Sequence, residues 1–266
     1  MKSLIDQFCP HVHEAALIAA DFDHLSGTIA TGDADGMVSL RRGGDSVTTM
    51  GLSGRGSVDG SLALSLGGEL LVIGDDTGSI GVYETAAGRQ IFFEERQGPR
   101  GRSRAFRGVA INQQGTLLAS ISIDRILRVW DLQKHERLFQ WVGYSGSSIH
   151  FDARGERILA ITEDGQPNLI NIWRSESQYL EPLQSPCNHV LFSPDGTLII
   201  AAGPAGFYVL EVATGALIGG QATQSSSGIA AVVVSPDGTK IGTITGRSIH
   251  TFLLPDLQFE ESYSHR

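Results

Sequence analysis

The sequence has few cysteines, few prolines and no long apolar run. Its two cysteines, Cys9 and Cys187, exclude a disulfide framework and indicate free thiols in a reducing compartment. No stretch approaches the roughly 18 consecutive apolar residues of a membrane span. Near the N-terminus, Asp6 interrupts the apolar residues before a signal-peptide core develops. These absences predict a cytoplasmic protein that has no membrane partner.

Basic charge is also scarce in this chain. Its 20 Lys and Arg residues stand against 29 Asp and Glu residues, which gives a formal net charge of −9. A molecule of this sign repels nucleic acid and anionic lipid, so we expect no nucleic-acid partner. The hydrophobic share of 41% excludes a disordered chain. A globular chain remains, and its 266 residues allow one large β domain or two smaller domains.

Glycine is abundant, with 33 residues, and much of it belongs to a repeat. An apolar alternating run, a polar turn ending in glycine and a second apolar run recur along the chain. The clearest copies are VLFSPDGTLIIAAG (190–203) and VVVSPDGTKIGTITG (232–246). Six copies at intervals of 40 to 47 residues occupy nearly the whole chain. The turn glycines of the six copies are Gly27, Gly68, Gly115, Gly155, Gly196 and Gly238.

Each copy continues with a third and a fourth apolar run. These runs are predicted at 79–84 and 89–94 in the second copy, 126–132 and 136–141 in the third, and 207–212 and 216–221 in the fifth. A period near 42 residues with four strands is typical of a propeller blade. We therefore predict an all-β fold, a β-propeller of about six four-stranded blades. Residues 14–266 form this single domain, and residues 1–13 form an N-terminal segment with a possible extra edge strand at 3–8.

The third copy carries the most recognisable motif. Val129-Trp130-Asp131-Leu132 follows Asp124 at a distance of six residues from the tryptophan. This copy resembles a repeat of the WD-repeat β-propeller family. In that family, an Asp in the turn between the second and third strands joins a hydrogen-bond network with a Ser or Thr, a His and the Trp. The candidate serine here is Ser120 or Ser122, and the His is absent from this copy. We expect Asp124, Trp130 and Asp131 to be structural.

The other copies depart from this motif. Tyr83, Leu210 and Phe252 replace the tryptophan in three copies, and the fourth copy retains Trp173. We expect these aromatic side chains to belong to the core between blades and not to a ligand cage.

Six copies are one fewer than the seven blades usual in the family, so the sequence does not decide whether the ring is closed. Three arrangements are considered. The chain closes as a compact six-bladed ring with residues 3–8 on an edge, it contains a further partial blade near its first copy, or the ring remains open. An open ring has unpaired strand edges, and a strand or blade from a partner would cover them.

An arginine-rich segment, EERQGPRGRSRAFR (94–107), separates the second and third copies and is interpreted as the longest insertion. It contains Arg96, Arg100, Arg102, Arg104 and Arg107. The resemblance implies that connections of this kind lie on the face that binds partners. We predict that this basic segment contacts a protein or peptide partner that is acidic or phosphorylated, because arginine binds carboxylate and phosphate groups in a bidentate manner. A solvated loop is the alternative interpretation.

Acidic residues follow the second run of several copies, at Asp33 and Asp35, Asp75 and Asp76, Asp124, and Glu163 with Asp164. The resemblance places them on the same face as the arginines. Tight turns also favour Asp and Gly, and we interpret these residues mainly as turn formers. The sequence DADG at 33–36 resembles the start of a calcium loop but has no distal Glu at the required spacing.

Histidines give no clear metal site. His11, His13 and Glu14 supply too few ligands, so a solvated N-terminal segment is the favoured interpretation. His150 and His189 occupy equivalent first strands and are candidates for hydrogen bonds between blades.

No nucleophile elbow, phosphate-binding loop or CxxC motif occurs, so no catalytic residue, metal or cofactor is assigned. The predicted function is a non-catalytic protein–protein interaction scaffold that docks a partner on its loop face within a larger complex. The alternative is a six-bladed, metal-dependent hydrolase or lactonase.

Overall fold

The computed structural model describes residues 13, 15–42, 47–51, 61–95, 105–223, 227–254 and 256–264. The chain divides into two compact units, 1–142 and 143–266, and each is described by itself. The N-terminal residues 3–8, predicted as a possible edge strand, lie outside the described residues, and the prediction of one domain over 14–266 stays a prediction.

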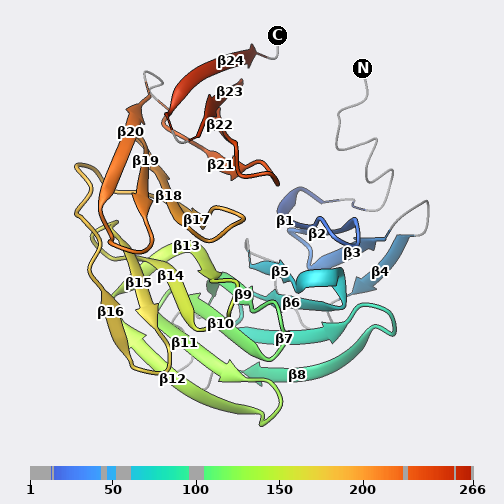
Figure 1. The fold of residues 1–266 in the computed structure, drawn as a ribbon. Coiled ribbons are helices and arrows are strands. Elements are labelled where there is room, and N and C mark those ends of the chain that lie inside the picture. Colours follow the sequence, from blue (N-terminus) through green and yellow to red (C-terminus); the bar gives the residue numbers. More distant parts are fainter. Residues whose placement is uncertain are drawn as a thin grey trace. The chain divides into compact units, whose positions relative to one another are not determined.

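The first unit contains three antiparallel four-stranded sheets, which we call blades 1, 2 and 3 (Figure 1). Blade 1 consists of β1 (Leu17–Asp23), β2 (Thr28–Asp33), β3 (Met37–Arg41) and β4 (Val47–Gly51). Blade 2 consists of β5 (Leu62–Leu64), β6 (Leu70–Gly74), β7 (Ser79–Glu84) and β8 (Arg89–Glu95), with the 3₁₀ helix η1 (Leu66–Gly68) between its first two strands. Blade 3 consists of β9 (Phe106–Ile111), β10 (Leu117–Ser122), β11 (Ile126–Asp131) and β12 (Glu136–Val142).

The second unit repeats this construction in blades 4, 5 and 6. Blade 4 consists of β13 (Tyr144–Phe151), β14 (Arg157–Thr162), β15 (Pro167–Asn171) and β16 (Glu176–Gln178). Blade 5 consists of β17 (His189–Phe192), β18 (Leu198–Gly203), β19 (Gly206–Glu211) and β20 (Leu217–Ala222). Blade 6 consists of β21 (Ala231–Val234), β22 (Lys240–Thr245), β23 (Ser248–Leu253) and β24 (Gln258–Ser264). In each sheet the strands follow one another in chain order.

The predicted fold class is confirmed: the chain is all-β, with six four-stranded propeller blades. The strands of the second, third and fifth copies begin and end within about one residue of the predicted runs. Second strands are the most buried, and every residue of β10 is buried. Fourth strands such as β12 and β20 are largely exposed. No helix long and apolar enough to cross a membrane occurs in the part of the chain that the structure describes.

The same turn joins the first and second strands in all six blades. All six predicted turn glycines have φ between +65° and +71°, a region that glycine enters without a steric cost. A polar residue precedes each glycine by three or four positions. In blade 5 the Gly196 N–H donates to the Ser193 carbonyl at 2.8 Å, and the Leu198 N–H donates to Ser193 Oγ at 2.9 Å. The equivalent polar residues are Asp23, Ser65, Asn112, Asp152 and Ser235.

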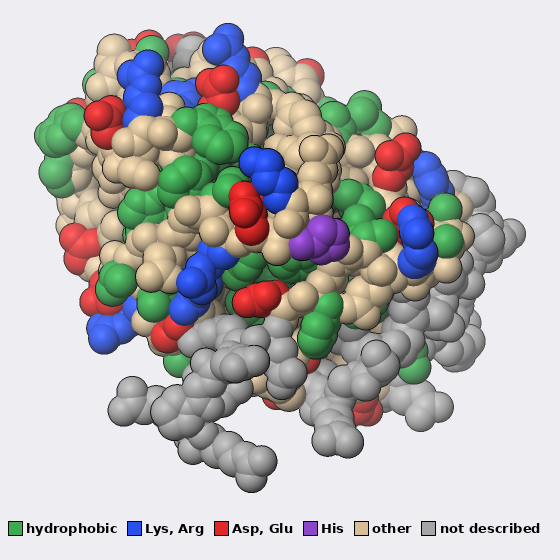
Figure 2. Space-filling view, turned by 90° about the horizontal axis from the view of Figure 1, so that it is seen from below, with side chains coloured by type: hydrophobic (Ala, Val, Ile, Leu, Met, Phe, Trp, Pro, Cys, Tyr) green, Lys and Arg blue, Asp and Glu red, His purple; other side chains and the backbone are tan. Residues whose placement is uncertain are grey.

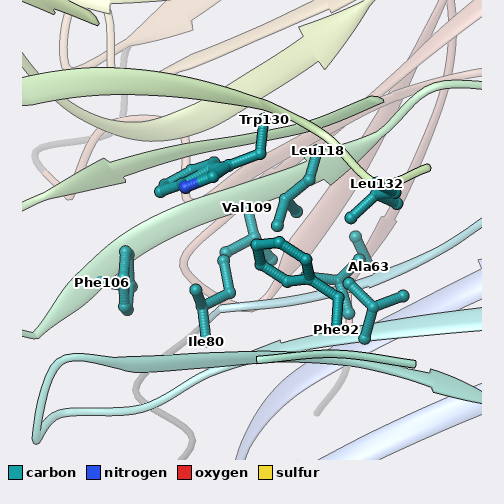
Figure 3. Close-up of a cluster of buried hydrophobic side chains, with 10 residues drawn as sticks. Ala63, Ile80, Phe92, Phe106, Val109, Leu118, Trp130 and Leu132 are labelled. Atoms are coloured by element: carbon teal, nitrogen blue, oxygen red, sulfur yellow. The ribbon is translucent and has the colours of Figure 1, made fainter. Parts of the chain in front are cut away.

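Adjacent blades within each unit share an apolar core. Between blades 2 and 3, Phe92 of β8 packs edge-on against Trp130 of β11, with 6.4 Å between ring centroids (Figure 3). Both side chains are almost fully buried, at 4% and 2% exposure. Trp130 therefore has the predicted structural role in the core.

Trp173 does not share this role, so its assignment to the core is wrong. It is 58% exposed and lies in the turn after β15. Strand register explains the difference: Trp130 pairs with Leu118, and the matching pair in blade 4 is Ile170 with Ile158. Ile170 thus holds the position equivalent to Trp130. Tyr83 does align with it, through its pairing with Leu71, and is partly buried.

Candidate functional site

Most of the predicted arginine site lies outside the residues that the structure describes. Arg96, Arg100, Arg102 and Arg104 fall outside the described residues, and Arg107 is an exposed residue of β9. The connection between β8 and β9 covers residues 96–105, since 94–95 and 106–107 belong to the two strands. Connections of the same length precede β5 and β17, so the interpretation of this segment as the longest insertion is wrong. The connection at 96–105 differs from the other two in its arginine content.

The connections differ between blades far more than the strands do. Residues 52–61, 96–105 and 179–188 each join a fourth strand to the next first strand, whereas Gly143 alone joins β12 to β13. Loops on a rigid scaffold commonly carry binding residues, because their sequences change without loss of the core. The variable part of this molecule is therefore the set of connections between blades.

The first blade holds a hydrogen-bonded triad that sequence reasoning missed. His13 Nδ1 lies 2.8 Å from Asp33 Oδ2, and His13 Nε2 lies 2.8 Å from Thr31 Oγ1. The side chains of His13 and Asp33 are only 5% and 2% exposed. The interpretation of His13 as part of a solvated segment is therefore wrong. The resemblance to the WD-repeat family implies a His in this network, and His13 precedes the first strand of the first copy.

Asp33 also organises the turn between β2 and β3. Its Oδ1 accepts the Asp35 N–H at 3.0 Å and the Met37 N–H at 2.9 Å. Burial acts to raise the pKa of Asp33, but the hydrogen bonds from His13, Met37 and Asp35 outweigh it and hold the pKa below its ordinary value. Both carboxylate oxygens are thus engaged within the blade.

Asp75 has the same turn role in blade 2. Its Oδ1 accepts the Thr77 N–H at 2.9 Å, the Thr77 hydroxyl at 2.7 Å and the Ser79 N–H at 2.8 Å. In blade 4, the Thr162 hydroxyl donates to Asp164. These contacts support the interpretation of the acidic residues as turn formers.

In the third blade, an arginine takes the place of the tryptophan as a hydrogen-bond donor to the turn aspartate. Asp124 accepts the Ser122 hydroxyl, and Arg128 Nη2 donates to Asp124 Oδ2 at 2.7 Å. Arg128 is only 9% exposed, and its Nη1 also donates to Ser122 Oγ at 3.0 Å. Among the described residues, Trp130 Nε1 and Ser120 Oγ are buried without a hydrogen-bond partner. Ser122, not Ser120, is therefore the serine of this network, and Trp130 contributes packing.

Hydrogen bonds also join neighbouring blades of the second unit. Ser148 Oγ of β13 donates to the Val190 carbonyl of β17 at 2.8 Å. Burial lowers the pKa of His189 below its ordinary value. His150 Nε2 lies 3.3 Å from Ser148 Oγ of its own strand. The prediction that His150 and His189 form hydrogen bonds between blades stays a prediction.

The face of the molecule seen in Figure 2 shows mixed charge. In the space-filling view, Lys and Arg side chains lie interspersed with Asp and Glu, with hydrophobic side chains between them (Figure 2). Over the described ranges, no group of three or more His, Cys, Asp and Glu side chains is placed to hold a metal ion.

Comparison with known proteins agrees with the architecture. The family model described as "WD domain, G-beta repeat" matches residues 98–131, which include β9 to β11. Eukaryotic translation initiation factor 3 subunit I of Aspergillus terreus is 29% identical over 103 residues, which cover 38% of this chain and 31% of that protein. The subunit I of Coccidioides immitis is 29% identical over 105 residues, with the same coverage.

The matched region thus spans about a third of these curated relatives, 31% of their length. The family-model match falls on the blade that has Asp124, Trp130 and Asp131. A family model thus matches the copy that resembles a WD repeat, and the six four-stranded sheets have the blade construction that this resemblance implies.

Proposed function

We propose that this protein is a non-catalytic docking scaffold that binds a protein partner through the connections between its blades, as a subunit of a larger complex. The observation that carries this proposal is the contrast between repeated and variable parts. The same turn and the same four strands recur six times, while the connections between blades vary from 1 to 10 residues. A scaffold of this design fixes loops in space and leaves their sequences free to specify a partner.

The polar residues of the blade turns support a structural interpretation over a catalytic one. His13, Asp33, Asp75 and Asp124 carry imidazole and carboxylate groups, which are types of group that acid–base chemistry and metal binding use. Each donates or accepts hydrogen bonds inside its own blade. These side chains stabilise the turns.

The relatives point to the same class of function. Their printed name makes each one a subunit of a translation initiation factor. We propose that this chain is likewise one subunit of a cytoplasmic multiprotein assembly, and that its own partner is set by its own connections.

Within this scaffold, we propose that Arg96, Arg100, Arg102, Arg104 and Arg107 bind an acidic or phosphorylated segment of the partner. Five arginines in a chain of net charge −9 make a local basic segment, and guanidinium groups bind carboxylate and phosphate with paired hydrogen bonds. An acidic partner would be steered to this segment and repelled elsewhere.

The test is charge reversal in the full chain, tagged and purified from its native cell. Arg100, Arg102 and Arg104 are changed together to Glu, and proteins that copurify are quantified by mass spectrometry. A matched control changes the exposed Arg137, Arg174 and Arg247 to Glu, which alters net charge by the same amount. We expect loss of the partner in the first variant only, with an unchanged melting temperature. Equal retention of partner in both variants would refute the arginine site.

A further inference from the structure

A cleft lies between blades 5 and 6, within the second unit. Its volume is about 640 Å³, which is in the range of roughly 300–1,000 Å³ typical of ligand pockets. We call it the blade 5–6 cleft. Its lining residues are Phe207, Gln221, Ala222, Thr223, Ile229, Thr243, Thr245, Ser248, His250, Phe252, Phe259 and Ser262.

The fourth strand of blade 5 lacks the large side chain that blade 2 has at the matching position. In blade 2, Phe92 pairs with Val82 on the fourth strand and packs against blade 3. The matching pair in blade 5 is Gly219 with Val209, so no side chain projects there from β20. Leu257 of blade 6 takes part of the gap, since a Cβ on Gly219 would meet its Cδ1 at 3.0 Å. Gly219 itself does not line the cleft, and the cleft residues of β20 are Gln221 and Ala222.

Three phenylalanines form an apolar floor. Phe207 and Phe252 meet edge to face with 4.9 Å between centroids, and Phe252 and Phe259 do so at 5.7 Å. Phe207 is 2% exposed, whereas Phe259 is 57% exposed. The aromatic surface therefore runs from the core to solvent. An exposed ring beside a cleft offers an anchor point for an apolar side chain of a ligand.

Hydroxyl and imidazole groups contribute the polar part of the lining. Thr243 pairs with His250 across β22 and β23, and Thr245 pairs with Ser248 two positions closer to the turn. His250 Nε2 lies 2.9 Å from Thr245 Oγ1. The residues that line the cleft include no Asp, Glu, Lys or Arg. Burial of a charged ligand group here would be costly because no opposite charge is available to pair with it.

Two strand edges flank the cleft. β20 is the last strand of blade 5 and β24 is the last strand of blade 6. A last strand has unpaired backbone N–H and C=O groups along its outer edge, which an extended peptide can bind. A peptide that lies along such an edge directs alternate side chains to one side, and one of them can enter a pocket.

We infer that the blade 5–6 cleft docks an uncharged, extended peptide segment of a protein partner, with one aromatic or large aliphatic side chain seated against Phe207, Phe252 and Phe259. This inference rests on the proposed docking function and adds a second site of different chemistry from the arginine segment. The arginines select acidic groups, and the cleft selects neutral, apolar ones.

The test uses a phage-displayed library of linear peptides selected on the full chain, followed by binding of the recovered synthetic peptides measured by fluorescence anisotropy. Ser262→Trp places a large ring at the mouth of the cleft. Glu261→Trp is the matched control, because Glu261 is the adjacent residue of β24 and does not line the cleft. Gln221→Arg, on the exposed rim, is a second blocking variant. Circular dichroism checks that each variant has the wild-type melting temperature.

We expect neutral peptides with a central aromatic or large aliphatic residue. Their affinity should fall at least tenfold with Ser262→Trp and with Gln221→Arg, and should not change with Glu261→Trp or with the triple arginine reversal. Recovery of no peptide, or of peptides that bind all variants equally, would overturn the inference. Acidic peptides lost only with the arginine reversal would also overturn it while supporting the proposed function. Occupation of the cleft by a small molecule alone would overturn the peptide assignment.

Discussion

Replacement of His13 by Ala should destabilise the first blade. His13 bridges Asp33 and Thr31 with two hydrogen bonds of 2.8 Å, in a site where the side chains of His13 and Asp33 are nearly fully buried. A hydrogen bond to a charged group contributes roughly 1.5–3 kcal/mol, and a buried group left without its partner loses that contribution. We therefore expect the free energy of unfolding to fall by about 2–3 kcal/mol.

Urea denaturation followed by circular dichroism at pH 7 measures this loss. His24→Ala is the matched control, because His24 is exposed in the turn between β1 and β2. It should change the unfolding free energy by less than about 0.5 kcal/mol. A similarly small change for His13→Ala would refute the structural role of the triad.

The same site predicts a dependence on pH. The pKa of Asp33 is lowered in the folded state, below an unfolded value of about 3.9. Its carboxylate therefore contributes stability above that pH, and the contribution is lost as pH falls through the lower folded value. The difference between wild type and His13→Ala should shrink below about pH 4.

Three further predictions test the core, the buried thiol and the turn. Phe92→Ala should reduce the free energy of unfolding by about 3–5 kcal/mol because it opens a buried cavity, while Phe93→Ala, at an adjacent residue that is 53% exposed, should change it little. In a Cys9→Ser background, Cys187 should react with a thiol reagent only after unfolding, since burial raises its pKa to about 12; rapid labelling of the native protein would contradict this. Gly196→Ala should cost about 1 kcal/mol from backbone strain alone, because φ is +71° and an added Cβ would meet no atom within 4 Å; an unchanged denaturation midpoint would contradict the turn assignment.

The repeat was predictable because its signals are local. A glycine that must have positive φ, preceded by a polar residue that bonds the turn, leaves the same short pattern in every copy, from Gly27 to Gly238. Alternating apolar runs then locate the strands. The six sheets and most strand boundaries follow from these two signals.

The errors concern residues whose roles depend on pairing across strands. Trp173 stands three positions beyond Ile170, the residue that its blade places opposite Ile158, and only the register reveals the offset. His13 and Asp33 are 20 residues apart, and their bond forms only when the chain entering β1 passes beside the β2–β3 turn. The blade 5–6 cleft is lined by residues from 207 to 262, and no local pattern shows that these residues meet when the two blades pack.

The most direct test of the scaffold assignment is native mass spectrometry of the tagged, full chain isolated under mild conditions from its own cell. We predict a defined complex with at least one other protein. The complex should be retained when exposed arginines elsewhere are reversed and lost when Arg100, Arg102 and Arg104 become Glu. Isolation of the chain alone, with stoichiometric bound calcium or zinc and hydrolase activity, would contradict it.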